Sequence, residues 1–439
     1  MAVENQNNSD GKKASAGNSS GRRKRASNRV RIEDLADIHQ RCAGIDVHKA
    51  GVTVCLSLGG GEGEVAEFGV TTAELRQLRT WLEENGVTHV VMESTGVYWK
   101  PVWQILEQGS LQLLLANAKQ VRNLPGRKTD GADAIWLATL LRKGLVRGSF
   151  IPPQQIRALR DLCRSRTTLV HDRTRVTQRI EKVLEEANIK LDTVVSDLLG
   201  KSARHMLDEL AAGETDTMSM AELALGQMRR KIPQLVTALE GNFLPHQLFL
   251  LQELLQQFDY LSSTIERYEQ RIAEYAAPFE AELQRVDAMP GINRIAAAAI
   301  LAETGVDMKQ FPRPEQFCKW ATICPGNNQS GGKRRNGSIG QGNRWLRGAL
   351  TEAAWAASRT KDSYFKAQYG RLLHRGKQRA LVAVAHSMLY TIWHLLHHAV
   401  DYQDLGIDYF QHRNLEGQKK LHVRKLQKMG FRVTLEAAI

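Results

Sequence analysis

The spacing of hydrophobic and polar positions divides the chain into segments of different character. The first 38 residues are basic and rich in Ser, Asn and Gly, a composition typical of disorder because it buries too little apolar surface. Short apolar runs then alternate with helical periodicity as far as Pro152, and the pattern beyond is almost wholly helical. We expect five segments, the last a basic tail: residues 1–38, 39–150, 151–282, 283–400 and 401–439.

The second segment begins with three β-rich runs. The stretch AGIDVHKAGVTVCLSL contains two of them, and EVAEFGVTT adds a third. Helical spacing over Ala73–Asn85, Val97–Gln108 and Thr129–Lys143 then alternates with two apolar strands, in VTHVVMES and LQLLLAN. The order β-β-β-α-β-α-β-α predicts a mixed sheet flanked by helices. This is the order of the ribonuclease-H-like fold, so we expect an α/β domain of that class, followed by mostly α-helical domains.

The third segment carries a heptad pattern. Apolar residues between positions 251 and 275 are spaced alternately three and four apart, which is the signature of a coiled coil. An earlier helix around residues 169–187 has similar spacing. The two helices can pair as an antiparallel hairpin within one chain or between subunits, and the sequence leaves both arrangements open. The heptad positions are Leu251, Leu254, Phe258, Leu261, Ile265, Tyr268, Ile272 and Tyr275.

Composition narrows the classes of function. The formal net charge is +13 and the sequence pI is about 9.5, which favours a polyanionic partner because neutralised phosphates release counterions.

The five cysteines contain no CxxC pair, which argues against a disulfide framework or a zinc site. No apolar run reaches the roughly 20 residues of a membrane span and the N-terminus is polar, so we expect a cytoplasmic protein without a membrane segment.

Four carboxylates are candidates for a catalytic metal site. Asp46 lies in the first predicted strand and Glu93 ends the fourth, while Asp130 and Asp133 are one helical turn apart. In a ribonuclease-H-like sheet these strands are neighbours and the last helix crosses their ends, which brings the four acids together. Their repulsion requires cations, and two divalent ions about 3.5–4 Å apart also activate a phosphodiester. Mg²⁺ suits an all-oxygen ligand set. Any one of these acids taken alone is more often a surface residue or a helix cap, and Asp130 can serve as a cap.

Two features of the fourth segment suit phosphate binding. The stretch MPGINRIAAAAIL has the pattern of a helix-hairpin-helix, although Asn293 replaces its second glycine, and a plain αα-hairpin explains it nearly as well. Farther on, a Gly-rich loop carries Ser330 and Ser338 among cations. A serine here is a candidate nucleophile on phosphorus. Most loop serines only bond to the backbone, so the residues alone do not choose between the two serines or assign a role to either.

Basic residues cluster around these positions and are candidates for nucleic-acid contacts. On helices such clusters are usually solvated faces, but the excess of one sign favours a DNA or RNA groove. The candidates are Arg122, Arg127, Lys128, Arg157, Arg160, Arg164, Arg173, Arg175, Arg179, Lys333, Arg334, Arg335, Arg344 and Arg347.

Five motifs in order carry a resemblance to a known family. GIDVHK, MESTGVYW, KTDGADA, PGI…AAAILAE and PG…QSGGKRRNGSIGQGNRWLR together resemble the DEDD-type transposases of insertion sequences, relatives of the Piv DNA invertase. The match runs from about Ala43 to Ser358. The resemblance implies a RuvC-like N-terminal domain, a coiled-coil insertion and a C-terminal transposase domain. The long helical segment before Ser330 is similar to the subgroup with an enlarged insertion.

The resemblance also implies a mechanism and partners. The acidic tetrad falls on Asp46, Glu93, Asp130 and Asp133, and the serine of the Ser-Gly-Gly-Lys motif falls on Ser330. That serine is expected to form a covalent phosphoserine link with a cleaved DNA strand, at composite sites in dimers that pair into a tetramer. An RNA encoded by the element is expected to pair with donor and target DNA, which agrees with base pairing rather than protein side chains reading sequence.

Two other functions remain open from the sequence. A junction-resolving endonuclease of RuvC type would use the same acids to hydrolyse DNA with water, and would keep cutting after Ser330 is replaced. A non-catalytic coiled-coil protein that binds RNA or DNA would lose no reaction when Asp130 is replaced. The intact spacing of all four acids counts against the second alternative.

Overall fold

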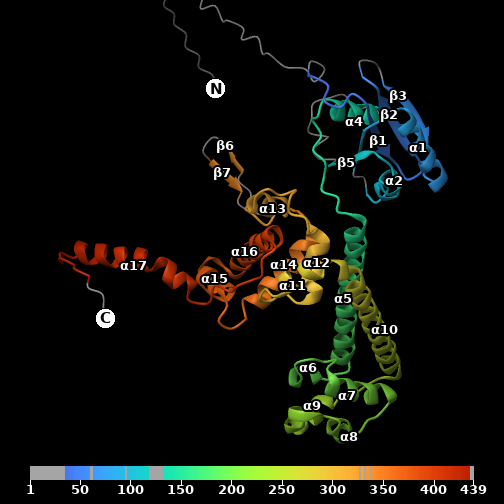
Figure 1. Cartoon of the computed structure of the whole chain (residues 1–439). Coiled ribbons are helices and arrows are strands. Elements are labelled where there is room, and N and C mark those ends of the chain that lie inside the picture. Colours follow the sequence, from blue (N-terminus) through green and yellow to red (C-terminus); the bar gives the residue numbers. More distant parts are fainter. Residues whose placement is uncertain are drawn as a thin grey trace, which may run out of the picture. The chain divides into compact units, whose positions relative to one another are not determined.

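The computed structural model describes residues 35–59, 63–93, 96–117, 132–325, 328–330, 333–336 and 339–435. Most of the predicted disordered extension, together with Asp130 and Ser338, lies outside these residues. The chain separates into two compact units, Met1–Ile151 and Pro152–Ile439. Helices and strands keep the labels of Figure 1.

A five-stranded mixed sheet forms the first unit (Figure 1). Its strand order is β3-β2-β1-β4-β5, in which β1 pairs antiparallel with β2 and parallel with β4. Strand β3 pairs antiparallel with β2, and β5 pairs parallel with β4. This arrangement confirms the expected mixed sheet and is compatible with the ribonuclease-H-like fold. The strands are β1 Cys42–Val47, β2 Val52–Ser57, β3 Glu64–Phe68, β4 His89–Glu93 and β5 Gln112–Ala116.

Helices cover both faces of this sheet because alternate strand residues point to opposite sides. Helices α1, Thr72–Glu84, and α2, Trp99–Leu106, pack on the face that carries Ile45 and Met92. Helix α4, Ala132–Arg142, packs on the other face, against Cys42 and Val91. Helices α2 and α4 lie within the predicted ranges, and α1 begins one residue before its predicted range. A capping box in which Thr71 and Glu74 bond each other's backbone N–H begins α1.

Two long antiparallel helices, α5 (Gln154–Glu186) and α10 (Pro245–Ala276), pack side by side in the second unit. The direction follows from cross-helix contacts, because Arg166 meets Glu269 while Arg173 meets Ser262. The antiparallel hairpin left open by the sequence is therefore formed within one chain.

The heptad pattern of α10 holds only in part. Leu251, Leu261, Ile265 and Ile272 are buried, whereas Tyr275 is 37% exposed. Leu255, which lies outside the heptad, is also buried because the distal end of α10 packs on further helices in addition to α5. A true coiled coil remains a prediction.

Short helices close the distal end of this pair. They pack on one apolar cluster that includes Val176 and Ile180 of α5 and Leu251 of α10. These elements are α6 Leu191–Val194, α7 Lys201–Ala212, α8 Thr217–Glu222, the 3₁₀ helix Gly226–Lys231 and α9 Ile232–Leu239.

The other end of the pair packs into a separate core with the C-terminal helices, through Leu159 and Cys163 of α5 and Ile272 of α10. A two-stranded hairpin of β6 and β7 precedes α14. The elements are the 3₁₀ helix Ala277–Phe279, α11 Glu280–Asp287, α12 Arg294–Thr304, α13 Pro314–Trp320, β6 Asn328–Ser330, β7 Lys333–Asn336, α14 Arg344–Ala357, α15 Tyr364–Leu372, the 3₁₀ helix Leu373–Arg375, α16 Lys377–His398 and α17 Tyr409–Lys428.

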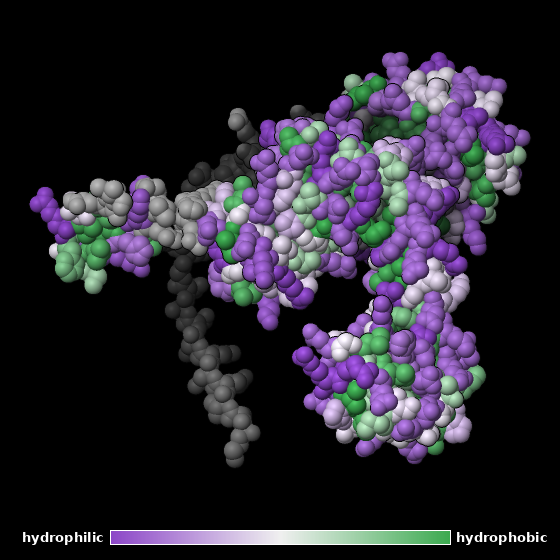
Figure 2. All heavy atoms as spheres, turned by 60° about the horizontal axis from the view of Figure 1, so that its bottom comes forward, coloured by the Kyte–Doolittle hydropathy of each residue, from purple (hydrophilic) through white to green (hydrophobic). Residues whose placement is uncertain are grey.

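Helix α16 is apolar for a reason visible in the packing. By length and composition alone it could cross a membrane, with a mean hydropathy of 1.2 over an 18-residue window of which 44% is buried. Val384, Met388 and Ile392 are fully buried in the core of the second unit. Packing within the protein therefore accounts for its hydropathy. The face of the molecule shown in Figure 2 is largely hydrophilic, with small hydrophobic areas between hydrophilic residues.

Candidate functional site

Neighbouring parallel strands carry the first two predicted acids. The register of β1 and β4 pairs Gly44 with Val91 and Ile45 with Met92. One residue further along the same register, Asp46 follows Ile45 as Glu93 follows Met92. Asp46 exposes 14% of its side chain and Glu93 is half-buried. The two carboxylates therefore belong to adjacent positions at the carboxyl ends of the two strands.

Both acids lie on the sheet face that α4 covers. Cys42 and Val91 pack against α4, and side chains two residues apart share a face, which places Asp46 and Glu93 there as well. Gly44 allows the helix to come close, because a Cβ at this position would lie 2.3 Å from the carbonyl oxygen of Ala134 and 2.4 Å from the nitrogen of Ala138. The glycine of GIDVHK is thus explained by helix packing.

The direction of α4 brings its first turn toward Asp46. The Cys42 Sγ donates to the Ala138 carbonyl oxygen at 3.8 Å, and Gly44 lies against Ala134 and Ala138. Moving along β1 toward Asp46 therefore means moving along α4 toward its N-terminus. Asp133 is in the first turn of that helix and is half-buried. Three of the four predicted acids are thus brought to one end of one sheet face.

His48 is a further member of this region that the sequence interpretation missed. Its Nε2 lies 3.0 Å from Asp46 Oδ2, and its side chain is 66% exposed. The signal was present in GIDVHK, because a residue two positions after Asp46 in an extended segment points to the same side.

The donor set suits a hard cation. Asp46, Glu93 and Asp133 offer carboxylate oxygens only, which are the ligands that Mg²⁺ prefers. Among the residues that the structure describes, no three acids, histidines or cysteines are close enough to hold a metal ion. The fourth acid, Asp130, lies outside those residues, as do Arg122, Arg127 and Lys128 beside it.

Ser330 is the last residue of a β-strand, where the sequence led us to expect a flexible loop. Strands β6 and β7 pair Ser330 with Lys333 and Gln329 with Arg334. An isolated bridge between Pro325 and Ile339 extends the pairing away from the tip. The two residues between the strands are both glycine in the sequence, which is a turn composition of two-residue hairpins. Lys333, Arg334 and Arg335 all belong to β7.

A buried carboxylate ties the helix after this hairpin to α5. Glu303 has 4% of its side chain exposed, and its oxygens accept from Arg164 Nε and Nη2 at 2.7 and 2.8 Å. The Asn343 Nδ2 donates to Glu303 Oε2 at 2.6 Å. Asn343 also caps α14, since its side-chain oxygen accepts from the Trp345 and Leu346 backbone nitrogens. The start of α14 is therefore held by an ion pair that reaches across to α5.

The predicted helix-hairpin-helix has contacts that favour the plain αα-hairpin. A Cβ on Gly291 would lie 2.4 Å from the Ala353 carbonyl oxygen and from the Ala357 nitrogen, so this turn packs closely against α14. The Asn293 side chain accepts from the Ala296 nitrogen at 2.9 Å, which occupies one N–H at the start of α12. A phosphate would have to compete with this cap.

The predicted basic residues fall into groups with different surroundings. Arg164 donates to the Glu303 carboxylate and Arg160 to the Ala302 and Glu303 carbonyl oxygens, and burial lowers the pKa of Arg160. Others also have protein partners: Arg157 donates to the Pro152 carbonyl, Arg173 to Ser262, Arg175 to Asp172, and Arg347 to the Gly340 carbonyl. Arg179 is exposed, and the Arg344 guanidinium lies 4.7 Å from the Trp345 ring centroid.

Comparisons with known proteins agree with this architecture. A family model for DEDD transposases of the IS110 type matches residues 43–189, and one for the transposases of the IS116/IS110/IS902 family matches residues 283–370. The chain belongs to the DEDD-type transposases of insertion sequences. The first match covers the sheet that carries Asp46 and Glu93, and the second covers the hairpin that carries Ser330. Residues 190–282 lie outside both matches.

Two relatives of this transposase are similar over most of their length. A probable family 20 transposase of Pseudomonas aeruginosa is 26% identical over 327 residues, which is 73% of this chain and 87% of that protein. A protein of Sinorhizobium fredii with the transposase designation y4qE is 25% identical over 396 residues, 82% of this chain and 89% of that protein. A DEDD transposase is a DNA-processing enzyme, so DNA is a partner, and the family is one for which divalent metal dependence is expected.

Proposed function

We propose that this transposase cleaves and exchanges DNA strands with Ser330 as nucleophile and the acids Asp46, Glu93, Asp130 and Asp133 as a divalent-metal site. The observation that carries the proposal is the common position of Asp46 and Glu93 at the ends of β1 and β4, under the first turn of α4 that holds Asp133. A bound Mg²⁺ would polarise the phosphodiester and neutralise the acids. The pairing of Ser330 at the end of β6 with Lys333 of β7 supports a nucleophile placed beside a cation.

The proposed step exchanges one phosphate ester bond for another, so the number of such bonds stays the same. The Ser330 oxygen attacks phosphorus, the bond from phosphorus to one deoxyribose oxygen breaks, and that oxygen takes up a proton as the serine loses one. The strand is then held as a phosphoserine ester. Reversal of the step by another strand's hydroxyl rejoins DNA without an external energy source, which is what strand exchange requires.

We infer the assembly and guide from the family resemblance and the charge. The net charge of +13 suits a complex with DNA and an element-encoded RNA, and the protein is proposed to act as a dimer that pairs into a tetramer. The domain limits are proposed to be 39–150 for the RuvC-like part, 151–282 for the coiled-coil part and 283–400 for the transposase part, flanked by the basic segments 1–38 and 401–439.

A strand-cleavage assay tests the mechanism. The full chain is incubated with Mg²⁺, the element's end DNA and its flanking RNA, and protein–DNA adducts are separated on denaturing gels. We expect an adduct that disappears in Ser330→Ala and after chelation of the metal, and that persists in the matched control Ser338→Ala. Cleavage that continues in Ser330→Ala without an adduct would make the protein a metal-dependent nuclease of the junction-resolving kind.

A further inference from the structure

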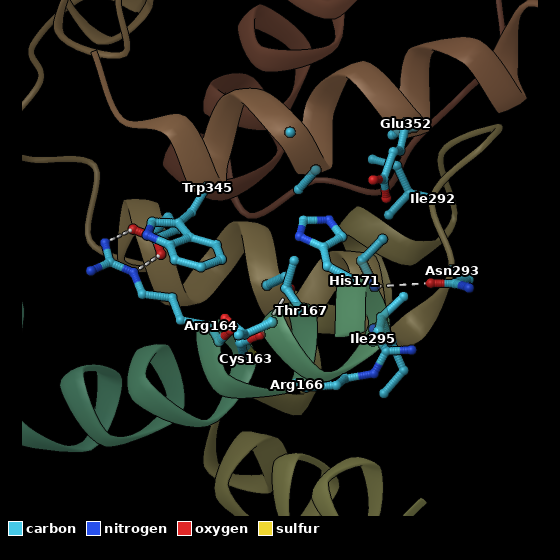
Figure 3. Close-up of a pocket in the computed structure, with 18 of the residues that line it drawn as sticks. Cys163, Arg164, Arg166, Thr167, His171, Ile292, Asn293, Ile295, Trp345 and Glu352 are labelled. Atoms are coloured by element: carbon cyan, nitrogen blue, oxygen red, sulfur yellow. Dashed lines mark hydrogen bonds and ion pairs between the residues drawn. The ribbon is translucent and has the colours of Figure 1, made fainter. Parts of the chain in front are cut away.

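A cavity of about 900 Å³ opens between α5, α12 and α14 in the second unit (Figure 3). Its size lies within the roughly 300–1,000 Å³ of ordinary ligand sites. All residues that line the cavity belong to the second unit, and none belongs to β6 or β7. No function proposed above uses this cavity as a binding site.

Part of the cavity lining is apolar. Ile295 and Ala296 of α12 and Ala349 of α14 belong to this part. Gly348, in the interior of α14, also lines the cavity, and a Cβ built there meets nothing within 4 Å. A glycine inside a helix costs roughly 1 kcal/mol relative to alanine, and no neighbouring atom requires it here. The α14 part of this lining therefore presents backbone and small side chains, which leave room for a planar ring.

Three arginines of α5 and α14 also line the cavity. They are Arg166, Arg175 and Arg344. Arg166 forms an ion pair with Glu269. Arg175 forms one with Asp172, and the two side chains are 67% and 39% exposed. Because an exposed ion pair contributes little free energy, a phosphate can replace Asp172 as the partner of Arg175. Arg344 has no ion pair among the residues that the structure describes, and its guanidinium is stacked over Trp345 at 4.7 Å. A guanidinium that is held in one orientation and has no ion-pair partner is available to bind a phosphate.

An acceptor and an imidazole complete the lining. Glu352 of α14 and His171 of α5 both line the cavity and project into the space between the helices in Figure 3. Both are exposed. The carboxylate of Glu303, by contrast, is neutralised by Arg160 and Arg164. Glu352 is therefore the acceptor available to a ligand that carries an amino group.

We propose that this cavity binds one unpaired nucleotide of the nucleic acid that the transposase handles. The base lies on the apolar lining of α12 and α14, Arg344 and Arg175 contact its phosphates, and Glu352 accepts from an exocyclic amino group. Unpaired bases are bound by proteins through stacking on side chains, with cations beside them that contact the backbone. The proposal rests on the proposed nucleic-acid function, and either a DNA or an RNA strand supplies the same chemistry.

Filling the cavity is the sharpest test. Gly348→Leu extends a side chain from a position where a Cβ meets nothing within 4 Å, and Gly348→Ala is the matched control that adds only this Cβ. Fluorescence anisotropy of the full chain measures binding of labelled oligo(dC), oligo(dT), oligo(rC) and oligo(rU). Loss of one stacked base corresponds to about tenfold weaker binding. We expect this loss in Gly348→Leu and wild-type affinity in Gly348→Ala.

Arginine variants provide a second, independent arm. Arg344→Ala removes the cation above Trp345 in the cavity, whereas Arg359→Ala removes an exposed arginine stacked on Trp355, 4.5 Å from its ring centroid and outside the cavity. We expect weaker binding only in Arg344→Ala. The preference for oligo(dC) over oligo(dT), and for oligo(rC) over oligo(rU), should be lost in Glu352→Gln. Comparison of the DNA and RNA probes identifies which strand supplies the nucleotide.

The outcomes separate this inference from the proposed function. Equal affinity of wild type and Gly348→Leu for all four probes, with both proteins folded by circular dichroism, would show that the cavity binds no nucleotide. The Ser330 adduct would be unaffected by that result. Absence of an adduct in wild type while Gly348→Leu still weakens oligonucleotide binding would instead refute the serine mechanism and leave the nucleotide site standing.

Discussion

The Arg164 guanidinium and the Glu303 carboxylate form a two-point contact, with Nε to Oε1 at 2.7 Å and Nη2 to Oε2 at 2.8 Å. Arg164 belongs to α5 and Glu303 to α12, 139 residues apart in the chain. Because Glu303 also accepts from Asn343 at the cap of α14, the contact joins three helices. It connects the long helix pair to the helix that directly follows the Ser330 hairpin.

Replacement of Glu303 by Ala should destabilise the second unit. The change leaves Arg160 and Arg164 without their counter-charge in a half-buried site, at a cost of about 3 kcal/mol. Urea denaturation followed by circular dichroism measures it. The matched control is Glu280→Gln, which breaks a surface pair with Arg294 and should leave the midpoint unchanged. Equal midpoints for Glu303→Ala and wild type would mean that the contact stabilises nothing.

Gly44→Ala should disrupt the packing of α4 on β1. The added Cβ would lie 2.3 Å from the Ala134 carbonyl oxygen, so the helix has to shift, at a cost of roughly 1–3 kcal/mol. Thermal unfolding reports the loss, and DNA cleavage should fall further because Asp133 moves away from Asp46. Gly148→Ala is the control, since its nearest atom would be at 3.6 Å. A wild-type melting temperature in Gly44→Ala would contradict the close approach.

The stability of the second unit should fall as the pH drops below 7. Burial lowers the pKa of His386 and of His394 from 6.5, and for His394 the neighbouring His398 and His397 add to the effect. A lowered folded-state pKa means that the neutral form is favoured, so the contribution is present above the ordinary pKa and is lost as pH falls toward the folded one. Urea midpoints at pH 7.5 and 5.5 should differ less in His386→Gln than in wild type. An identical pH difference in the variant would exclude His386 as a source.

Thiol reagents should distinguish Cys324 from the other cysteines. All five cysteines are free; four are buried and Cys324 is partly exposed. Burial raises the pKa of Cys42 to about 11 and that of Cys163 and of Cys318 to about 12, so their reactive thiolate forms are scarce. Labelling with an aromatic disulfide reagent at pH 8 should modify Cys324 first. Rapid labelling of Cys163 in the native protein would contradict its burial, and Cys324→Ser should remove the fast phase.

Much of the architecture follows from local pattern. The alternation in GIDVHKAGVTVCLSL and the helical periods of residues 73–85 and 97–108 predict β1, β2, α1 and α2, because side-chain spacing of two or about four residues reports which face is buried. The predicted strand order gives the neighbours of β1 that place Asp46 beside Glu93. The two glycines after Ser330 are typical of a hairpin turn, and the structure has a hairpin where the sequence analysis predicted a loop.

Other features depend on contacts that local pattern cannot encode. Arg160 and Arg164 have the same helical spacing as a solvated basic face, yet Glu303 binds both from a distant helix. His48 becomes a neighbour of Asp46 only through the extended geometry at the end of β1. The heptad of α10 is incomplete because the distal helices bury Leu255 as well.

By itself the sequence determined the order of strands and helices in the first unit, the acidic and serine motifs and the family of this transposase, because each depends on residue type and spacing along one segment. Tertiary structure decided which arginines are committed to Glu303, how closely α4 approaches β1 at Gly44, and where a cavity opens above Gly348. These depend on the distances between helices far apart in the chain, and such distances are set by the packing of whole side-chain surfaces rather than by any local period.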